Sequence, residues 1–413
     1  MEIYLVGGAV RDKLLGLPVK ERDWVVLGET PESMVKHGYR PVGKDFPVFL
    51  HPKTHEEYAL ARTERKTAPG YKGFTIHAAP DVSLEQDLIR RDLTINAMAM
   101  TPEGRLIDPY GGQIDLEKRI FRHISPAFAE DPVRILRIAR FAARYGHLGF
   151  TLAEETRSLM QSMVTAGEVD HLVPERVWAE LFKALNEKSP SAFFYTLKAC
   201  AALDKIFPEI QCLFGVPQPE HYHPEIDTGI HVMLCLEQAA LLSASPEVRF
   251  AALVHDLGKG VTPRANWPHH YGHETQGLRI LEQLCMRLRV PNSFKTLAVQ
   301  VMQYHSHCHR AFELRASTIT DMLAALGAYK PRHKLSEFLQ ACEADAKGRT
   351  GFENTPYPQA VLLSGAAKAA ASVDTSSILN GEFKGSHIGE AIRRLRIKAV
   401  AEFIKAESAP AES

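Results

Sequence analysis

The chain has 413 residues, more than one hydrophobic core usually organises, so two or more domains are expected. Its 49 Lys and Arg residues balance 49 Asp and Glu residues, which excludes a polybasic protein that bulk charge would hold on nucleic acid. With 45% hydrophobic and 24% charged residues, extensive disorder is excluded, and no apolar run is long enough to span a membrane. Six widely spaced cysteines without a Cys-x-x-Cys pair predict reduced, buried thiols in a cytoplasmic protein.

Short apolar runs alternate with turns and a short helix at the start of the chain. Residues 3–6 and 24–27 are predicted strands, and two glycines lead from the first strand into a helix over about 9–16. More strands are expected near 46–50, 55–62 and 105–108. Because this pattern has too few crossover helices for a doubly wound sheet, we predict an α+β head with a mixed sheet up to about residue 115.

From about residue 116, long amphipathic helical patterns replace the strands. Apolar side chains follow a helical period within 135–142 and again within 181–197, which predicts an all-helical remainder. Several prolines interrupt these patterns, and the densest cluster lies between Gly215 and Pro224. We therefore expect a domain boundary in that segment.

A glycine-rich motif, Gly-Gly-x-Val-Arg-Asp at 7–12, lies between the first strand and the first helix. Glycines such as Gly8 let backbone N–H groups approach a triphosphate, and Arg11 adds a planar guanidinium for its oxygens. Glu21 and Asp23 follow, and as positions i and i+2 of a strand they would point to one face. Two carboxylates on one face are costly without a cation, which predicts a Mg²⁺ site. The alternative is a plain turn followed by a solvated acidic edge.

A third carboxylate is available in the strand expected over 55–62. Tyr58 and Leu60 mark one face of this strand as core, so Glu57 lies on the other face beside small alanines that leave room for a nucleotide. Glu56 suits the site less well because it would share the core face. Glu57 is therefore the predicted third acidic residue.

Arg90-Arg91-Asp92 precedes a further predicted helix. Asp92 or Thr94 could cap that helix, which is one interpretation of the motif. Two adjacent arginines in front of a helix are also suited to clamp phosphate. The two interpretations stay open on the sequence of this motif alone.

A stripe of arginines follows Asp131 on the next predicted helix. Arg134, Arg137 and Arg140 recur every three residues and share one side of the helix, while the other side is apolar. Such a stripe is often just a solvated face. Here the arginines lack acidic partners at position i+4, which favours an anionic ligand.

In this order, the Gly-Gly motif, the paired acids, Arg-Arg-Asp-x-Thr-Ile-Asn-Ala and Glu-Asp-Pro-x-Arg-x-x-Arg resemble the bacterial class II tRNA nucleotidyltransferases. The similarity is greatest to CCA-adding enzymes of the gammaproteobacterial type, which carry an HD domain, and it weakens after about residue 355. It implies a nucleotidyltransferase head, a neck with a nucleotide-reading helix, a helical body, an HD phosphohydrolase domain and a helical tail. The corresponding ranges are 1–115, 116–185, 186–224, 225–347 and 348–413.

The resemblance also implies roles for residues of the head and neck. Gly8, Arg11, Arg91, Arg137 and Arg140 would bind the nucleotide, Glu21 and Asp23 would hold Mg²⁺, and Asp131 and Arg134 would read the base. A carboxylate accepts from the exocyclic amine of C or A and an arginine donates to ring acceptors, so G and U are mismatched. The family often has Asp as its first metal ligand where this chain has Glu21, which keeps the charge and the ligand type.

The implied reaction is attack of a tRNA 3′-hydroxyl on the α-phosphate of CTP or ATP, with release of pyrophosphate. Glu57 would help to activate the hydroxyl. The helical body would hold the acceptor stem and T-arm by backbone and shape, since every tRNA must be accepted. A monomer is expected, with a homodimer as the alternative.

Ten of the 19 histidines lie between residues 221 and 309. His-Asp-Leu-Gly-Lys at 255–259, after an apolar run, resembles the HD phosphohydrolase family. By this resemblance the metal ligands are His231, His255, Asp256 and Asp345, with Asp321 as the alternative to the last, and His273 and His305 could complete a second site. Such nitrogen-rich sites suit transition metals, and the family implies Ni²⁺-supported phosphatase, 2′,3′-cyclic phosphodiesterase and 2′-nucleotidase activity. The alternative is a degenerate domain kept for packing.

Two other classes of protein compete with this interpretation. A poly(A) polymerase shares the head motifs, but such enzymes usually carry a basic tail, and residues 408–413 are not basic. A non-catalytic tRNA-binding protein is the second alternative, and the intact acids, arginines and His-Asp pair argue against it.

Overall fold

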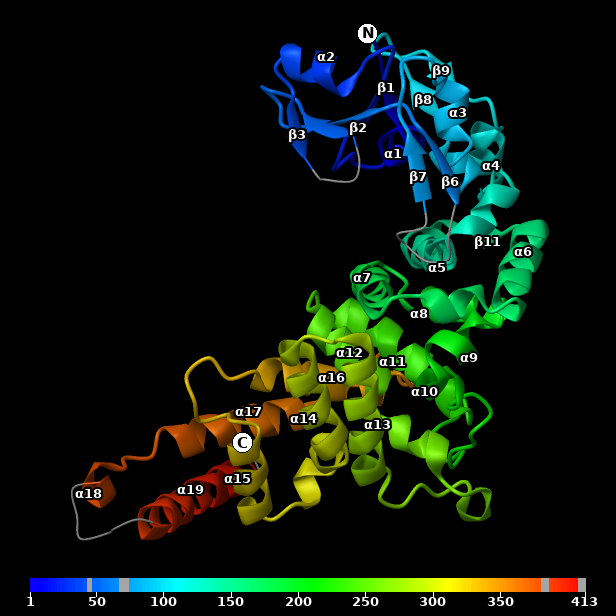
Figure 1. Cartoon of the computed structure of the whole chain (residues 1–413). Coiled ribbons are helices and arrows are strands. Elements are labelled where there is room, and N and C mark those ends of the chain that lie inside the picture. The colour runs from blue at the N-terminus through cyan, green and yellow to red at the C-terminus, as the bar shows by residue number, and fades with distance from the viewer. Residues whose placement is uncertain (43–46, 67–73, 380–385, 408–413) are drawn as a thin grey trace. The chain divides into compact units, whose positions relative to one another are not determined.

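The computed structural model describes residues 1–42, 47–66, 74–379 and 386–407 (Figure 1). They form two compact units, one of Met1–Glu180 with Ala192–Ile206, the other of Leu181–Ser191 with Phe207–Ser413. The last of the three divisions of the chain falls between Ile206 and Phe207, upstream of the Gly215–Pro224 segment expected from the prolines. Residues 408–413, whose composition argued against a poly(A) polymerase, and residue 46 of an expected strand lie outside the described residues.

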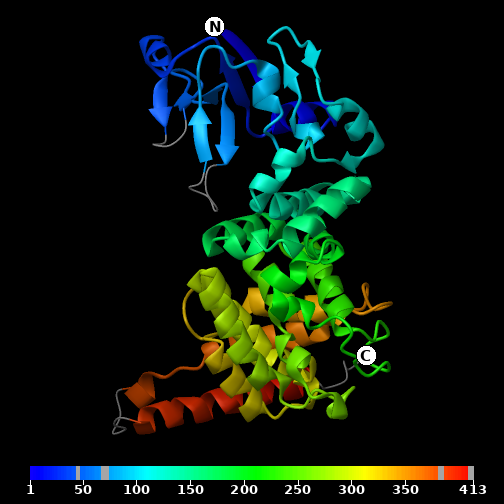
Figure 2. The same ribbon diagram turned by 45° about the vertical axis from the view of Figure 1, so that its right-hand side comes forward.

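A seven-stranded mixed sheet forms the first unit's α+β part, with strand order β3-β4-β5-β2-β1-β8-β9. Its strands are among the blue to cyan arrows of Figure 2. Its strands are β1 Glu2–Val6, β2 Asp23–Leu27, β3 Arg40–Val42, β4 Val48–Leu50, β5 Glu57–Leu60, β8 Ala99–Met100 and β9 Leu106–Ile107. The neighbours β2 and β5 run parallel, and the other pairs run antiparallel. The predicted α+β head with a mixed sheet is confirmed.

Two small two-stranded pairings were not expected from the sequence, one in the head and one in the part predicted to be all-helical. Strands β6 Thr63–Lys66 and β7 Phe74–His77 pair antiparallel, and β10 Ile120–Phe121 pairs parallel with β11 Thr151–Leu152. Strand β2 begins at Asp23, so Glu21 precedes the strand. The argument that both acids occupy strand positions i and i+2 is therefore wrong for Glu21.

The central sheet separates two apolar cores because side chains alternate along its strands. Val25 packs into a core with Leu88 of α3 Leu84–Leu88, whereas the next residue, Val26, packs with Met34 of α2 Pro31–Lys36. Each of these four side chains is at most 1% exposed. The polar strand ends that carry the site are thus fixed by burial on both faces of the sheet.

Helices make up the rest of the first unit. They are α1 Gly8–Leu14, α4 Gly112–Lys118, α5 Val133–Tyr145, α6 Glu154–Thr165, the start of α7 Pro174–Leu185, α8 Ser191–Ala199 and α9 Ala202–Ile206. In α5 the apolar positions 135, 138, 139 and 142 are buried, as the helical period predicts.

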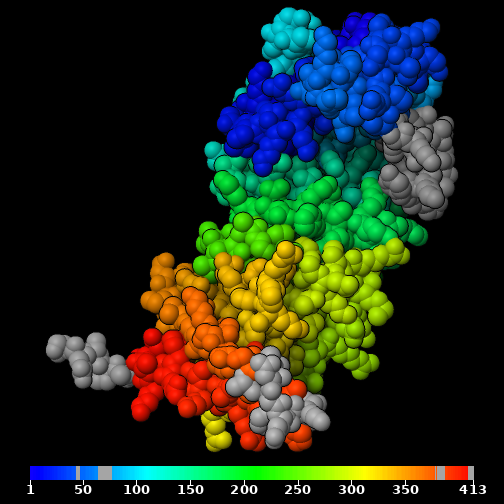
Figure 3. Space-filling model, turned by 90° about the vertical axis from the view of Figure 1, so that its left-hand side faces the viewer, coloured from blue at the N-terminus to red at the C-terminus, as the bar shows by residue number. Residues whose placement is uncertain are grey.

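Helices joined by loops make up the second unit, and among its described residues the one β pairing is the isolated bridge between Pro217 and Asp227. Its helices are α10 Pro208–Gln211, α11 Thr228–Leu242, α12 Pro246–Val254, α13 His273–Leu288, α14 Asn292–His309, α15 Ala316–Ala325, α16 Leu335–Lys347, α17 Pro358–Ala371, α18 Ser376–Leu379 and α19 Ser386–Glu407. Helices α11, α12, α14 and α16 pack against one another around buried side chains such as Leu236, Phe250, Val301 and Phe338. Helix α19 lies along α17, and their surfaces adjoin (Figure 3).

Two further expectations concern the cysteines and the membrane. All six cysteines are free thiols, but Cys212 is exposed, so the prediction that every thiol is buried is wrong there. Among the described residues, no helix combines the length and apolar character needed to cross a membrane.

Candidate active sites

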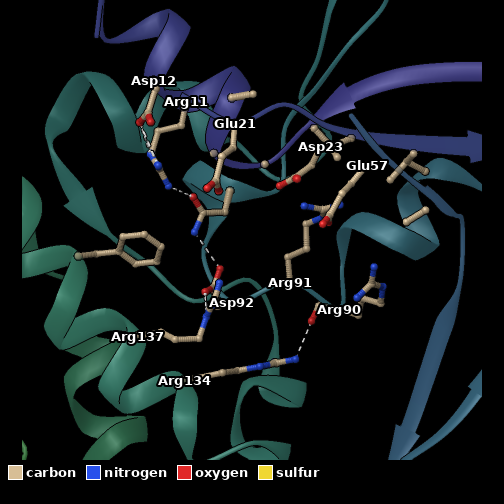
Figure 4. Close-up of a pocket in the computed structure, with 18 of the residues that line it drawn as sticks. Arg11, Asp12, Glu21, Asp23, Glu57, Arg90, Arg91, Asp92, Arg134 and Arg137 are labelled. Carbon is tan, nitrogen blue, oxygen red and sulfur yellow. Dashed lines mark hydrogen bonds and ion pairs between the residues drawn. The ribbon is translucent and has the colours of Figure 1, made fainter. Parts of the chain in front are cut away.

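All residues predicted to bind Mg²⁺ or nucleotide line one pocket of about 690 Å³ in the first unit (Figure 4). They are Gly8, Arg11, Glu21, Asp23, Glu57, Arg91, Asp131, Arg134, Arg137 and Arg140. The sheet contributes the acids, and α5 with the segment before it contributes most of the basic groups. The carboxylates therefore face the arginines across a space large enough for a nucleotide.

The three acids lie together because β2 and β5 are parallel neighbours. Asp23 and Glu57 occupy paired positions of these strands, and Glu21 lies two residues before β2. Burial raises the pKa of Asp23, Arg91 opposes the rise, and Glu21 adds to it. No hydrogen bond or ion pair from a described residue reaches these carboxylates, so the donor set fits a hard divalent cation.

The glycine turn brings two arginines close to its backbone. Gly7 has a φ of +68°, and a Cβ there would lie 2.9 Å from Arg91 Nη1, so a side chain would strain the backbone and displace the guanidinium of Arg91. Arg11 is buried and donates to Asp12 Oδ1 at 3.0 Å and to Asn96 Oδ1. The buried Nε of Arg91 makes no hydrogen bond with any described residue, which fits a donor awaiting an anionic oxygen.

Two arginines of α5, Arg137 and Arg140, have acidic partners, which come from other elements and not from positions i+4 of the helix itself. Arg137 Nε donates to Asp92 Oδ2 at 2.7 Å, and Arg140 Nε donates to Glu180 Oε2 at 2.6 Å. Burial alone would raise the pKa of Asp92, but Arg137 and the amide of Asn96 hold it well below its usual range. These pairs fix the guanidinium groups along the pocket wall.

The capping role considered for Asp92 or Thr94 is not observed. A 3₁₀ turn, Thr94–Asn96, follows instead of an α-helix, and neither side chain caps it. Asp92 accepts from Leu93 N and Asn96 Nδ2, each at 2.9 Å, while the Thr94 hydroxyl donates to Asp115.

Asp131 is held by a residue that the sequence did not indicate. Its Oδ1 and Oδ2 accept from the two terminal nitrogens of Arg176 at 3.2 and 2.9 Å, and Oδ1 also accepts from Val133 N at the start of α5. Arg134 donates to the carbonyl oxygens of Ala127 and Arg90 at 3.0 and 2.7 Å. Both predicted base-reading side chains are therefore held in place at the N-terminal end of α5.

The four predicted HD ligands converge in the second unit. His231 lies on α11, His255 and Asp256 follow α12, and Asp345 lies on α16. His231 Nε2 is 3.1 Å and His255 Nε2 is 3.6 Å from Asp345 Oδ1, and His255 Nε2 is 3.2 Å from Asp256 Oδ2. All four side chains are buried, none being more than 6% exposed as a residue.

The donor atoms of this cluster fit a metal ion. His255 Nδ1 donates to Ala252 O at 2.8 Å, which leaves Nε2 facing the carboxylates. Within the described residues, His255 Nε2 and both oxygens of Asp256 are buried without a hydrogen bond. Burial would raise the pKa of Asp345, yet the neighbouring His255 and His309 hold it well below its usual range. Nitrogen and carboxylate donors in this number suit a divalent transition metal.

A second group of possible ligands adjoins the first at Asp256. His273 Nε2 and His305 Nε2 lie 3.4 and 3.8 Å from Asp256 Oδ1. Burial lowers the pKa of His305 to about 3, which keeps its imidazole in the neutral form that binds metals. Asp321, the alternative to Asp345, instead forms a two-point ion pair with Arg393 on an exposed surface.

Several residues around the HD cluster were not predicted from the sequence. Lys259 Nζ lies 2.6 Å from Asp256 Oδ2 and donates to Gln218. Cys235 Sγ is 3.4 and 3.7 Å from the two ring nitrogens of His231, and this near-equal spacing places the sulfur over the ring instead of along a nitrogen lone pair. His309 contacts Asp345, and its position one helical turn after His305 is a signal that could have identified it.

Three family models match successive parts of the chain. The Poly A polymerase head domain matches residues 3–122, the probable RNA and SrmB-binding site of polymerase A matches 149–213, and the HD domain matches 228–340. The multifunctional CCA protein of Methylococcus capsulatus is 64% identical over 410 residues, which cover 99% of this chain and 96% of the relative. That of Nitrosococcus oceani is 61% identical and covers 98% of this chain and 100% of the relative.

The chain belongs to the multifunctional CCA protein family. This confirms the resemblance inferred from the motifs, and the full-length relatives separate the chain from poly(A) polymerases, which the head model alone does not. A solved CCA-adding enzyme in an apo form superposes with a TM-score of 0.67 at 21% identity, over 98% of this chain and 91% of that one. Other solved CCA-adding enzymes of this fold contain ATP, CTP or tRNA.

Proposed function

We propose that this chain adds and repairs the 3′-terminal CCA of tRNA with CTP and ATP, without a nucleic-acid template. We further propose that its HD domain is a metal-dependent phosphatase, 2′,3′-cyclic phosphodiesterase and 2′-nucleotidase. The observation that carries the first activity is the pocket in which three unpartnered carboxylates face a wall of fixed arginines. The observation that carries the second is the buried convergence of His231, His255, Asp256 and Asp345, in which His255 and Asp256 have buried ligand atoms without a hydrogen bond to a described residue.

In the head, Glu21 and Asp23 would hold Mg²⁺, which when bound would neutralise triphosphate charge and lower the pKa of the attacking hydroxyl. Glu57, paired with Asp23 across two strands, is placed to take the proton from the tRNA 3′-hydroxyl. A bond then forms between the 3′-oxygen and the α-phosphorus, and pyrophosphate leaves with the former bridging oxygen. Arg11 and Arg91 would bind the triphosphate oxygens.

Base selection would rest on Asp131 and Arg134. A carboxylate has about four acceptor sites, and three of those on Asp131 are used by Val133 N and the two nitrogens of Arg176. The remaining acceptor site, on Oδ2, suits the exocyclic amine of C or A. Because Arg176 and the α5 backbone hold the carboxylate in place, the base is read by a group that cannot rotate to accommodate G or U.

The arginines that line the pocket with Arg134 would complete the nucleotide site. Arg137 and Arg140 are each anchored by one carboxylate, which leaves further guanidinium donors on the same groups for phosphate or base. An anchored arginine loses less rotational freedom when it binds than a mobile one. This is the physical reason for acidic partners in a site that binds an anion.

In the HD domain, His231, His255, Asp256 and Asp345 would hold a transition metal, Ni²⁺ being the family's effective ion, with His273 and His305 available for a second. The bound ion would polarise the phosphate ester as a Lewis acid. Lys259, 2.6 Å from Asp256, keeps a positive charge at the edge of the cluster. A pocket of about 490 Å³ reaches Asp256, Asp345 and Lys259 and would admit a nucleotide end.

The arrangement of domains along the chain is part of the proposal. We assign residues 1–115 to the head, 116–185 to the neck, 186–224 to the body, 225–347 to the HD domain and 348–413 to the tail. The match of an RNA-binding model to residues 149–213 supports a tRNA surface on the neck and body, which would hold the acceptor stem and T-arm. We expect a cytoplasmic monomer, with a homodimer as the alternative.

The decisive experiment supplies tRNA that lacks its 3′ end, labelled CTP and ATP, and Mg²⁺. Addition that stops after C, C and A is expected, because the pocket reads only C and A and the family completes this triplet. A long A-tract would identify a poly(A) polymerase instead. Binding of tRNA without any addition would identify a non-catalytic tRNA-binding protein.

A further inference from the structure

The two oxygens of Asp345 face different surroundings. Oδ1 points toward the proposed metal cluster, 3.1 Å from His231 Nε2 and 3.6 Å from His255 Nε2. Oδ2 points away from those histidines and accepts a hydrogen bond from His309 Nε2 at 2.7 Å. The carboxylate is thus divided between a metal-facing oxygen and an oxygen held by a neighbouring imidazole.

His309 is itself held on its other side. Its Nδ1 lies 2.9 Å from the hydroxyl of Tyr357, which directly precedes α17, and that hydroxyl also lies 3.2 Å from Cys308 Sγ. Because a carboxylate only accepts, the neutral imidazole of His309 must carry its proton on Nε2, which makes Nδ1 the acceptor for Tyr357. The hydroxyl has one proton and two possible acceptors, Cys308 Sγ and His309 Nδ1. When it donates to Nδ1, the stronger and closer acceptor, it favours the tautomer that can donate to Asp345.

His309 and Tyr357 lie next to the HD cluster but are not among its four proposed ligands. His309 lies on α14 one turn after His305, and Tyr357 is 9% exposed at the edge of the same pocket. Tyr357, His309 and Asp345 thus form a continuous chain of hydrogen bonds. Each link is a directional hydrogen bond, so together they fix an angle as well as a position.

We propose that His309, oriented by Tyr357, is a positioning residue that makes Asp345 a one-oxygen ligand of the HD metal. With Oδ2 engaged, the carboxylate cannot turn both oxygens to the ion, and Oδ1 stays aimed at the space between His231 and His255. Outer partners of this kind typically change metal affinity 10- to 100-fold when they are removed. This inference rests on the proposed HD function only in that the four residues bind a metal.

The consequence for metal choice follows from geometry. Carboxylates that offer two oxygens suit larger ions that take six to eight oxygen ligands, whereas one oxygen beside imidazole nitrogens suits smaller transition metals. Removal of His309 should therefore weaken binding of Ni²⁺ and Co²⁺ more than binding of Ca²⁺. Without His309, the metal preference of the cluster would shift toward ions that favour oxygen ligands.

The test measures metal binding apart from turnover, on the full chain stripped of metal. Competition with a chromophoric chelator gives the Kd for Ni²⁺ and Co²⁺ in the wild type, H309A, H309Q and Y357F. H307A is the matched control, because it removes an exposed histidine two residues away on the same helix. We expect a 10- to 100-fold higher Kd for H309A, partial recovery in H309Q, whose amide can still donate to Oδ2, and a smaller increase for Y357F.

A wild-type Kd in H309A would overturn the proposal, and so would a loss of turnover with an unchanged Kd, which would make His309 a group that acts on the substrate. If H309A does not fold, wild-type affinity in Y357F together with H309Q at the level of H307A overturns it equally. If the wild type binds Ni²⁺ but hydrolyses no cyclic phosphate, the proposed HD activity fails while the Kd series still decides the role of His309.

Discussion

The two candidate cation sites differ in their donor atoms, in the elements that supply them and in their burial. The acids of the head pocket lie at the first residues of the adjacent strands β2 and β5 and just before β2. They carry only oxygen donors and are exposed. The HD cluster mixes nitrogen and oxygen donors, draws them from several helices and buries them. An open oxygen site suits Mg²⁺ that arrives with a nucleotide, whereas a closed nitrogen-rich site suits a resident transition metal.

The sites also differ in how their charges are balanced without a metal. In the head, the three carboxylates have no hydrogen-bonded partner among the described residues, and the arginines are paired with other acids. In the HD cluster, histidines and Lys259 lie within ion-pair distance of the aspartates. The charges of the HD aspartates are therefore partly balanced by neighbouring side chains, whereas the carboxylates of the head have no such partner among the described residues.

The largest effect that would separate the sites is expected from D23N. The amide keeps the shape of the side chain but removes a charged ligand, so incorporation of labelled CMP into tRNA should fall about 10³-fold or more. Binding of tRNA and hydrolysis of 2′,3′-cyclic phosphate should remain near wild type. A variant that adds CMP at the wild-type rate would show that Asp23 does not hold the metal.

The reciprocal change is H255A or D256A in the HD cluster. Removal of a metal ligand should lower cyclic phosphate hydrolysis by at least about 10²-fold, and CCA addition should persist. In metal-stripped wild type, Ni²⁺ or Co²⁺ should restore hydrolysis better than Mg²⁺. Loss of CCA addition in H255A would show that the two sites are coupled.

Asp92 is one of the acids that hold the arginines of the head pocket in place. D92N is expected to lower the free energy of unfolding by about 2 kcal/mol at neutral pH, because it breaks a buried charged hydrogen bond to Arg137. The pKa of Asp92 is depressed in the folded state, so its contribution is present above the ordinary value of 3.8 and is lost as the pH falls toward the native pKa. Urea unfolding at several pH values should show wild type and variant converging in acid. A difference that grows in acid would contradict this sign.

A smaller effect, on fidelity, is expected from D131A or R134A. Loss of a hydrogen-bonding partner to a base edge costs on the order of 1–3 kcal/mol, so misincorporation of UMP or GMP should rise about 10-fold or more, with transfer slowed less. Sequencing of the added nucleotides measures it. Unchanged fidelity in both variants would leave Asp131 with its bond to Val133 N as a helix-capping residue only.

The smallest effect is expected from E21D. This shorter acid keeps the charge and the oxygen donors, and Glu21 lies before β2 in a segment without regular secondary structure. Addition should stay within a few-fold of wild type, on the order of 1 kcal/mol or less. Loss of activity comparable to D23N would show that the length of this side chain is decisive.

Sequence patterns located the acids well wherever a local period applied. Glu57 was preferred to Glu56 because alternate strand positions share a face, and the structure pairs Glu57 with Asp23 on adjacent strands while Glu56 accepts from Trp24. The same argument was wrong for Glu21, because a strand boundary cannot be read to within two residues from apolar alternation.

What the sequence by itself predicted was most strands of the central sheet, the long helices and the donor groups of both candidate sites, since strand alternation, helical period and the adjacency of His255 and Asp256 are local properties. Only the tertiary structure decided which charge meets which. Arg137 finds Asp92, and Arg176 finds Asp131, each across 45 residues, and His309 finds Asp345 across 36. The physical reason is that a helix period states which face a side chain occupies, whereas its partner depends on which helix the packing of the apolar cores brings to that face.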